Sequence, residues 1–426
     1  MSNEQKLTWL ASFSHFITHG YMTLLPGVLV VIAAEHSMSF MDIGIIANIG
    51  YFLYGLGSFP AGYLADKFGS KRLLTIGVTG MACSSILVGL SPSILTFGIT
   101  YGMLGIFASI HHPAGLSLIA RRVTAKKGKA LGLHGVLGNV GLFCTPLMAG
   151  LSIMLFNSWR SAYILFGVVG LFFAMILYSV RIESEPDLHF RDLLFWKNKG
   201  PARPAEPPGQ IDADDRQVPT TSIPVALLVL YMGSILSGFI FRGSLTFFPA
   251  LFKENIYFIT THDEPVVIAG FVTTAVLSLG LIGSWFGGYI NDKIKRPELF
   301  PVIIFSIIGP TLYLVSRFVD SSLLISASVF SLIYYAWQPS HNYLIAKYTR
   351  KASHGLGFGV NFFLIFGIGS IATALGGYTA DNYGVDKFYW FMAIIAIAAL
   401  ITALTVIAVK QFYVKFTWQL IKENDE

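Results

Sequence analysis

Twelve apolar stretches, most of them about 20 residues or longer, follow one another along the chain and restrict what it can fold into. An α-helix needs about 20 apolar residues to cross the hydrocarbon core of a bilayer. A backbone in lipid must also satisfy its own hydrogen bonds, which a helix does. We therefore expect an all-α membrane protein with twelve transmembrane helices. The spans are placed near residues 7–34, 40–65, 73–91, 94–120, 129–155, 160–181, 222–251, 266–290, 299–317, 321–346, 354–380 and 386–410.

The composition agrees with the membrane class. Hydrophobic residues form 54% of the 426-residue chain and charged residues only 12%. A soluble domain typically carries about 25% charged residues. The lipid bilayer is therefore the main environment that we predict for this chain.

Residues 182–221 interrupt the apolar pattern with a polar, proline-rich stretch, which we expect to be a cytoplasmic linker. Residues 1–181 and 222–411 would then form two six-helix bundles, and residues 412–426 a cytoplasmic tail. Most of the 29 Lys and Arg residues lie on the side that carries the linker and both termini. The positive-inside rule makes that side cytoplasmic, in the inner membrane or a membrane derived from it. The net charge of +6 then reflects topology, and nucleic acid is not an expected partner.

The two halves of the chain resemble each other at an offset of about 226 residues. The segment Ser58–Lys67 matches Ser284–Lys293, and both end in Gly-Tyr-x-x-Asp-Lys. At the same offset Pro113 aligns with Pro339. Duplicated halves around a binding site at the membrane midplane are typical of secondary transporters. The repeat therefore predicts two pseudo-symmetric bundles.

A charged loop that contains two glycines and an aspartate follows the second span. It reads Gly62-Tyr-Leu-Ala-Asp66-Lys67-Phe-Gly69-Ser-Lys71-Arg72. Glycine permits close approach and a tight turn, and the aspartate can pair with basic groups or with a helix N-terminus. Such a loop can latch two helices in one conformation and release them in another. The gating residues that we predict are Gly62, Asp66, Lys67, Gly69, Lys71, Arg72 and, in a second copy of the motif, Asp292; the alternative is a generic basic loop.

This stretch resembles the loop 2–3 signature of the major facilitator superfamily, G-x-x-x-D-[RK]-x-G-[RKx]-[RK]-[RK]. Gly288, Asp292 and Lys293 form a degenerate copy in the loop where that family also carries one. The span from Gly138 to Gly150 is similar to the family's span 5 antiporter signature. The resemblance covers nearly the whole chain and implies the major facilitator fold with alternating access. His112-Pro113-Ala114 is similar to the fosmidomycin-resistance-like efflux branch.

Ionisable groups within the spans are the candidate binding residues. All 23 acidic residues fall in loops, tails or span ends on this assignment. An ionisable group in lipid is costly and normally faces a cavity or a partner. Arg242, about 15 Å below the outer surface at 1.5 Å per residue, suits an anionic substrate group. The alternative is a structural role, by snorkelling or by binding backbone carbonyls.

Histidines of the first and fourth spans are further candidates for the substrate site. His15 and His19 are four residues apart and share a helix face, and His19 is the repeat partner of Arg242. Histidine titrates near neutral pH, so proton coupling is open to these residues. His112 ends a stripe of small residues. Hydrogen-bonded packing is the alternative for the first two, and helix packing for the third.

The second half contributes Trp337, Gln338, His341 and Asn361 to the predicted substrate site. The first two are the repeat partners of His111 and His112. Both pairs precede a proline, which can break a helix and expose backbone carbonyls to a cavity.

The sequence thus predicts a secondary active transporter that moves a small solute, anionic or drug-like, with protons or a counter-substrate as further partners. An enzyme is not expected, because no catalytic constellation or nucleotide motif appears, and no cofactor is expected. Two alternatives stay open. Intramembrane histidines could carry a transition metal or a metal chelate, with ligands that sequence alone cannot name. The chain could also be a transporter-like sensor that binds its ligand without moving it.

Overall fold

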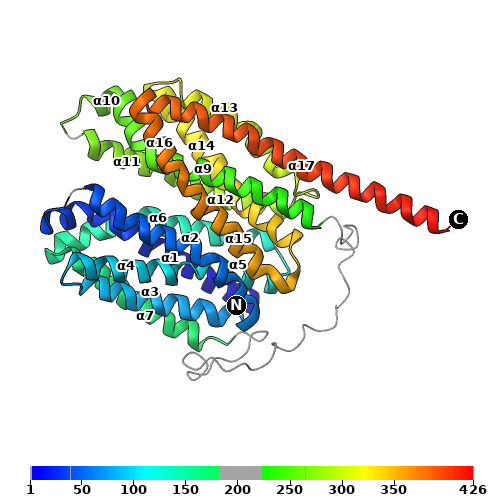
Figure 1. Ribbon diagram of the computed structural model, residues 1–426, viewed down its shortest axis with the longest axis horizontal. Coiled ribbons are helices and arrows are strands. Elements are labelled where there is room, and N and C mark those ends of the chain that lie inside the picture. The colour runs from blue at the N-terminus through cyan, green and yellow to red at the C-terminus, as the bar shows by residue number, and fades with distance from the viewer. Residues whose placement is uncertain (1, 39, 182–222, 264, 426) are drawn as a thin grey trace.

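The computed structural model describes residues 2–38, 40–181, 223–263 and 265–425, and these fold into helices joined by short loops (Figure 1). The expected linker, 182–221, lies outside the described residues. In the first half the helices are α1 (Asn3–Glu35), α2 (Phe40–Phe68), α3 (Ser70–Gly89), α4 (Ile94–Ala108), α5 (His111–Arg122), α6 (Lys127–Phe156) and α7 (Trp159–Ser179).

The second half contains α9 (Ile223–Asn255), the short α10 (Tyr257–Thr260), α11 (Pro265–Ser278), α12 (Gly280–Asn291), α13 (Leu299–Val315), α14 (Asp320–Tyr348), α15 (His354–Phe362), α16 (Ile371–Tyr383) and α17 (Val385–Asp425). Between α15 and α16 lie the irregular turns η3 (Phe363–Gly367) and η4 (Ile368–Ser370). Helix α17 runs beyond residue 411, where a tail was expected.

Three pairs of helices join end to end, so the described helices, apart from the short α10, form twelve rods, six before and six after the linker. The joined pairs are α4 with α5, α11 with α12, and α15 with α16. Eight helical stretches in the described part are long and apolar enough to cross a membrane by length and composition. The order of the rods agrees with the spans expected from the sequence.

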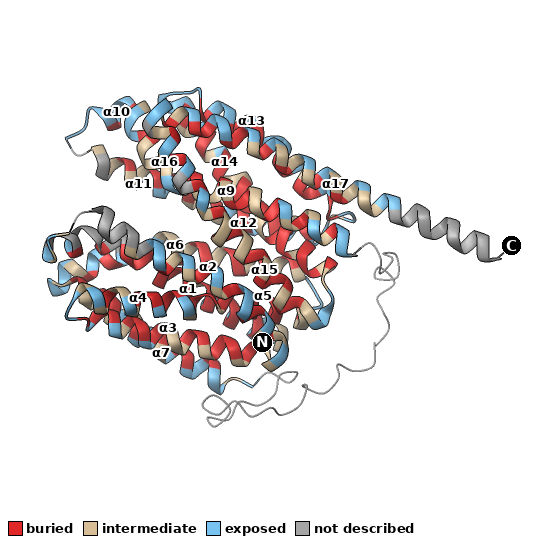
Figure 2. Ribbon diagram, in the orientation of Figure 1, coloured by how far each residue is buried: buried red, intermediate tan, exposed pale blue. Residues whose placement is uncertain are grey.

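The rods form two groups, α1–α7 and α9–α17, which lie side by side (Figure 1). Buried aromatic residues fill both interiors, Tyr21, Trp159 and Tyr163 in the first and Phe248 and Tyr389 in the second. Exposed side chains lie mainly on the outer helices (Figure 2), and many of them are large and apolar. An apolar exterior around a packed interior is what a lipid-embedded bundle requires.

A proline breaks the fourth rod between α4 and α5. Pro113 has no N–H, so the carbonyl of Ser109, four residues earlier, loses its usual partner within the helix. The hydroxyl of Ser58 on α2 lies 3.3 Å from this carbonyl and shares its hydrogen between it and the Tyr54 carbonyl at 3.0 Å. A serine of a neighbouring helix therefore satisfies the group that the proline leaves open.

The same arrangement recurs 226 residues later. Pro339 lies inside α14 and frees the carbonyl of Tyr335. Ser284 of α12 donates its hydroxyl to that carbonyl, again at 3.3 Å. Ser284 and Tyr335 are the repeat partners of Ser58 and Ser109. The duplication read from the sequence thus extends to a side-chain hydrogen bond.

Candidate functional site

A cavity lies between the two halves, with about 500 Å³ of empty space including the part open to solvent. Among the predicted residues, His19, Trp337, Gln338 and His341 line it, whereas Arg242, His15, His112 and Asn361 do not. Most of the other lining residues are aromatic, and these aromatic residues were not predicted as ligands. The full set of other lining residues is Asn139, Phe241, Tyr334, Tyr335, Asn342, Phe362, Ile365 and Phe366.

His341 is held in a fixed position at the cavity wall. Its Nε2 atom lies 2.9 Å from the hydroxyl of Ser234 and 3.1 Å from Oδ1 of Asn361. The ring stacks on Trp337 one helical turn earlier, with centroids 4.3 Å apart. Asn361 is fully buried, so its contribution to the cavity is to orient the histidine.

Arg242 lies half-buried on α9, next to the cavity and behind one of its walls. Its guanidinium carbon is 4.7 Å from the ring centre of Tyr51 and 5.8 Å from that of Phe366, which lines the cavity. The Nε atom is buried and has no hydrogen-bond partner among the described residues. A buried donor without a partner is costly, so this group lacks an acceptor in this conformation.

Irregular backbone brings the aromatic wall into place. Turn η3 is a π-helical turn at Phe363–Gly367, between the regular helix α15 and the 3₁₀ turn η4. Such turns inside a helix are rare and occur often at functional sites. This one contributes Ile365 and Phe366 to the cavity. The periodicity of apolar residues does not indicate this turn.

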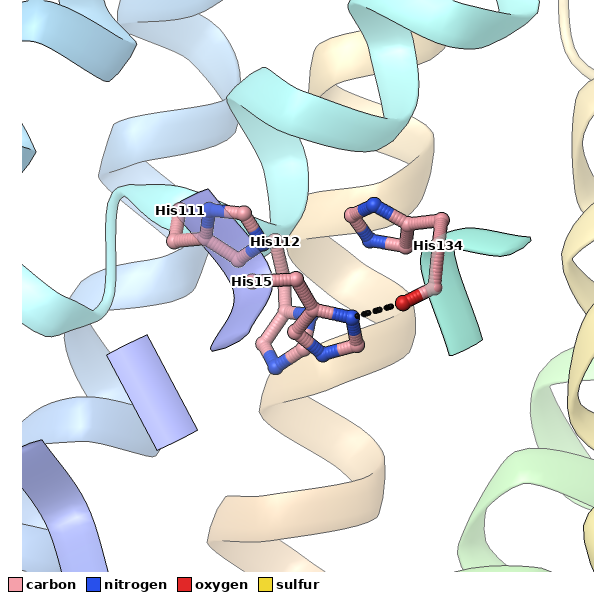
Figure 3. Close-up of side chains that lie close together, drawn as sticks. All are labelled: His15, His111, His112 and His134. Carbon is pink, nitrogen blue, oxygen red and sulfur yellow. Dashed lines mark hydrogen bonds between the residues drawn. The ribbon is translucent and has the colours of Figure 1, made fainter. Parts of the chain in front are cut away.

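His15 and His112 lie in a buried group of histidines behind the cavity, within the first half (Figure 3). His15 Nε2 is 3.1 Å from His19 Nε2, so the group reaches the cavity through His19. His112 stacks on Phe362 of α15 with centroids 4.0 Å apart. His134 of α6 and His111 of α5 complete the group.

Asp66 joins the two halves at the end of the molecule where the loop after α2 lies, which we name the Asp66 end. Its carboxylate accepts hydrogen bonds from the backbone N–H groups of Gly355 and Leu356, both at 2.7 Å. These donors belong to the first turn of α15, where N–H groups lack partners within the helix. Arg121 of α5 forms an ion pair with the same carboxylate and donates to the Lys351 carbonyl at 3.0 Å.

Asp292 makes the reciprocal contact from the second half. It accepts hydrogen bonds from the N–H groups of Gly128 at 2.7 Å and Lys129 at 2.8 Å, in the first turn of α6. A side chain at Gly62 or Gly288 would collide with the carbonyl of Gly355 or Gly128, respectively. Glycine therefore permits the backbone approach that both aspartates need.

The remaining residues of the predicted gate lie within the first half. Gly69 has a φ of 93° and precedes α3, a conformation that favours glycine. Lys71 is buried and donates to the carbonyls of Tyr178 and Val180 at the end of α7. Lys67 lies over the ring of Phe68 at 5.4 Å, and Arg72 starts α3 beside Lys71. Among the contacts described, the ion pair of Asp66 is with Arg121, which the motif does not include.

Comparison with known proteins decides the family. The model of the Major Facilitator Superfamily matches residues 11–374. The chain belongs to this superfamily. Its members are transporters, so the predictions of the major facilitator fold and of a transporter rather than an enzyme are confirmed.

The curated relatives within the superfamily are distant. A probable hexose phosphate transport protein of Chlamydia pneumoniae is 23% identical over 91% of this chain and 86% of its own. Its counterpart in Chlamydia trachomatis is matched over 65% of its length. The fosmidomycin resistance protein of Escherichia coli is 22% identical over 92% of this chain and 90% of its own. A probable sulfoacetate transporter of Cupriavidus necator is 24% identical over 62% of this chain and 60% of its own.

Solved structures of the superfamily show the same fold. FucP in the outward conformation aligns with a TM-score of 0.72 at 13% identity, over 95% of this chain and 99% of that one. The proton:xylose symporter XylE aligns with the same TM-score at 16% identity, over 95% of this chain and 96% of that one. The chain is thus a multi-pass secondary transporter with two six-helix bundles.

Proposed function

We propose that this transporter carries a small organic anion between the two halves by alternating access. The observation that carries the proposal is Arg242, a cation beside the cavity with a buried Nε that has no hydrogen-bond partner among the described residues. No acidic residue lines the cavity in the described part of the chain. A guanidinium without a carboxylate partner is suited to phosphate, sulfonate or carboxylate groups.

The relatives support an anionic substrate. Hexose phosphate and sulfoacetate, named for the Chlamydia and Cupriavidus proteins, are both anions. At 22–24% identity these names do not fix one substrate. They do support a requirement, common to these relatives and this chain, for a cation near the substrate site.

The rest of the cavity fits the organic part of such a molecule. Phe241, Tyr334 and Phe366 provide flat apolar surfaces, and Gln338 has a buried Oε1 atom without a partner among the described residues. His341 and Asn139 add polar groups to the wall. Pockets of this kind combine apolar surface with a few placed polar groups, which fix the orientation of a ligand.

The two aspartate contacts would form the gate. Both lie near the basic loops that we assign to the cytoplasm, so we infer that the structure is closed on that side. Both termini would then be cytoplasmic, in the inner membrane or a membrane derived from it. Release of Asp66 and Asp292 from α15 and α6 would open the cavity to the cytoplasm.

Counterflow into proteoliposomes tests the proposal. Wild-type protein should exchange at least one of hexose 6-phosphate and sulfoacetate, assayed at several pH values, and should not exchange a neutral hexose. Arg242→Ala should raise the apparent KM for the anion at least tenfold. The KM of Arg242→Lys should lie between those of the wild type and Arg242→Ala. Arg317→Ala, at an exposed arginine, is the matched control and should leave the KM unchanged. Exchange of the neutral hexose alone, or an unchanged KM in Arg242→Ala, would refute the anion site.

A direct binding measurement separates a transporter from a sensor. One relative, at 22% identity over 93% of this chain, is a membrane sensor protein of Salmonella typhimurium. Saturable binding of an anion without exchange in the same vesicles would assign this chain to the sensors. Binding with exchange supports the proposed carrier.

A further inference from the structure

Four histidines from three helices come together inside the first half (Figure 3). They are His15 on α1, His111 and His112 on α5 and His134 on α6, and each is at most 2% exposed. Each offers one ring nitrogen, and these four atoms lie within 4.8 Å of one another. Among the described residues no carboxylate or cysteine joins the group.

Four of the eight ring nitrogens in this group lack hydrogen bonds among the described residues. Nε2 of His111, Nδ1 of His112 and both ring nitrogens of His134 are buried without a partner among the described residues. The Ala11 carbonyl interacts with the His134 ring outside hydrogen-bond geometry. A buried polar atom without a partner costs about 1–3 kcal/mol. Packing alone does not account for several such atoms facing one another.

The hydrogen bonds that are present prepare the rings to bind a ligand. Nδ1 of His15 donates to the backbone carbonyl of His134 at 2.7 Å, which makes Nε2 the acceptor of the neutral ring, 3.1 Å from His19 Nε2. His111 Nδ1 lies 2.9 Å from the Ser14 hydroxyl. Histidines that bind metals usually hold their second nitrogen in this way, which fixes the ring and its tautomer.

The backbone also makes room for the group. A side chain at Gly138 of α6 would collide with the ring of His15. The break at Pro113 sets α5 off from α4 just where the two adjacent histidines begin the helix. The three helices therefore bring four imidazoles to one point.

We propose that His15, His111, His112 and His134 bind one divalent transition-metal ion of the zinc class. Imidazole ligands favour zinc, copper, nickel and cobalt over magnesium and calcium. Tetrahedral Zn²⁺ with Zn–N distances of about 2.0–2.1 Å separates its ligands by about 3.4 Å. The four nitrogens lie within 4.8 Å of one another, so binding requires the rings to rotate and the widest pair to close by up to about 1–1.5 Å.

The ion is a resident of the first half and not the transported solute. All four ligands belong to α1, α5 and α6, and none of them lines the cavity between the halves. A solute carried by alternating access binds where both halves can reach it. His19 lies between the site and the cavity, with its Nε2 3.1 Å from His15 Nε2 and 3.4 Å from His112 Nε2. The metal site does not depend on which solute the cavity accepts.

Metal content of the purified protein tests the site. The full chain is purified in detergent without a histidine tag, stripped with a chelator, incubated with Zn²⁺ and separated from free ion by gel filtration. Wild-type protein should retain about one zinc per chain, as a four-histidine site predicts. Co²⁺ in place of Zn²⁺ should give the intense visible absorption of a tetrahedral complex. Zinc at background level, or a weak octahedral cobalt spectrum, would overturn the proposal without any variant.

Two variants locate the ion. His134→Gln and His111→Gln should each lower the zinc affinity at least tenfold. His354→Gln is the matched control, because His354 is buried outside the group and binds the carbonyls of Ala346 and Thr349. This control variant should bind zinc with the same affinity as the wild type. Equal zinc binding in all three variants would place the ion elsewhere and refute the assignment; gel filtration and circular dichroism confirm that each variant is folded.

Discussion

Asp66 and Asp292, which are 226 residues apart, make the same contact in opposite directions across the two halves. Each carboxylate accepts two backbone hydrogen bonds, of 2.7–2.8 Å, from the first turn of a helix in the other half. A carboxylate at a helix N-terminus is favoured by the unpaired N–H groups and by the helix dipole. The halves are thus fastened by two related contacts at one end, and only Asp66 has the added ion pair with Arg121 among the contacts described.

Loss of the Asp66 charge should open this end of the protein. Hydrogen bonds to a charged group contribute about 1.5–3 kcal/mol, so Asp66→Asn should shift the equilibrium between closed and open states roughly 10- to 100-fold. Transport should fall while membrane insertion stays normal. The shift is measured by thiol labelling of Gln338→Cys from the Asp66 side, after Cys83 and Cys144 have been replaced. Unchanged labelling and unchanged flux would show that Asp66 is not part of a gate.

A methyl group at Gly62 should have the same effect through sterics. Gly62→Ala places a carbon against the Gly355 carbonyl, and Gly288→Ala places one against Gly128. In both variants the Gln338→Cys thiol should be labelled faster from the Asp66 side, and transport should be slower. Gly377→Ala is the control, because a side chain there meets no atom within 4 Å. If all three variants behave alike, the glycine contacts do not control the gate.

Glu298 should make the second half sensitive to acid. This carboxylate is 3% exposed and lies 3.0 Å from Nζ of Lys410 and 3.5 Å from Nζ of Lys347. Burial raises its pKa, but the two lysines and a backbone N–H outweigh burial and hold the pKa below its ordinary value of 4.5. A lowered pKa stabilises the fold above pH 4.5, and this stabilisation is lost as the pH falls through the folded-state pKa.

Thermal unfolding in detergent measures this effect. Between pH 7 and about pH 3 the wild-type unfolding temperature should fall further than that of Glu298→Gln. At pH 7 the variant should be less stable by about 1–3 kcal/mol, because Lys347, Lys410 and Tyr348 lose a charged partner. Parallel pH curves for the two proteins would contradict the assignment.

In each half, a serine hydroxyl bonds the carbonyl that a proline leaves without a partner. Removal of either hydroxyl should destabilise its half by a similar amount. Ser58→Ala and Ser284→Ala each leave a buried carbonyl without this donor, at a cost of about 1–3 kcal/mol. Ser306→Ala, an exposed serine that bonds within its own helix, should change stability by less than about 0.5 kcal/mol. Denaturation of the purified variants compares the three; no difference between them would show that the serine bonds are dispensable.

The fold was largely predictable because its strongest signals are local. Runs of apolar residues place the rods within a few residues, and the repeat of Ser58–Lys67 at Ser284–Lys293 shows the duplication. The aspartate positions were predictable for the same reason, since the motif is contiguous. The donors at Gly355 and Gly128 were not, because they lie far away in the sequence and contribute only backbone N–H groups.

The site was predictable only in part. His19, Trp337, Gln338 and His341 line the cavity, and their polar or aromatic character within apolar runs drew attention to them. The helix face alone did not separate His15 from His19, because the packing of α5 and α6 buries His15 and leaves its neighbour at the cavity. The π-helical turn at Phe363–Gly367 depends on packing between the halves, which no local pattern encodes.

The glycine contacts also create a target for inhibition. Where Gly62 meets Gly355 and Gly288 meets Gly128, two backbones touch without side chains between them. A compound that binds at either glycine contact would block the conformational change while leaving the substrate cavity empty. Its potency would then be independent of the concentration of competing solute, which distinguishes it from any substrate mimic.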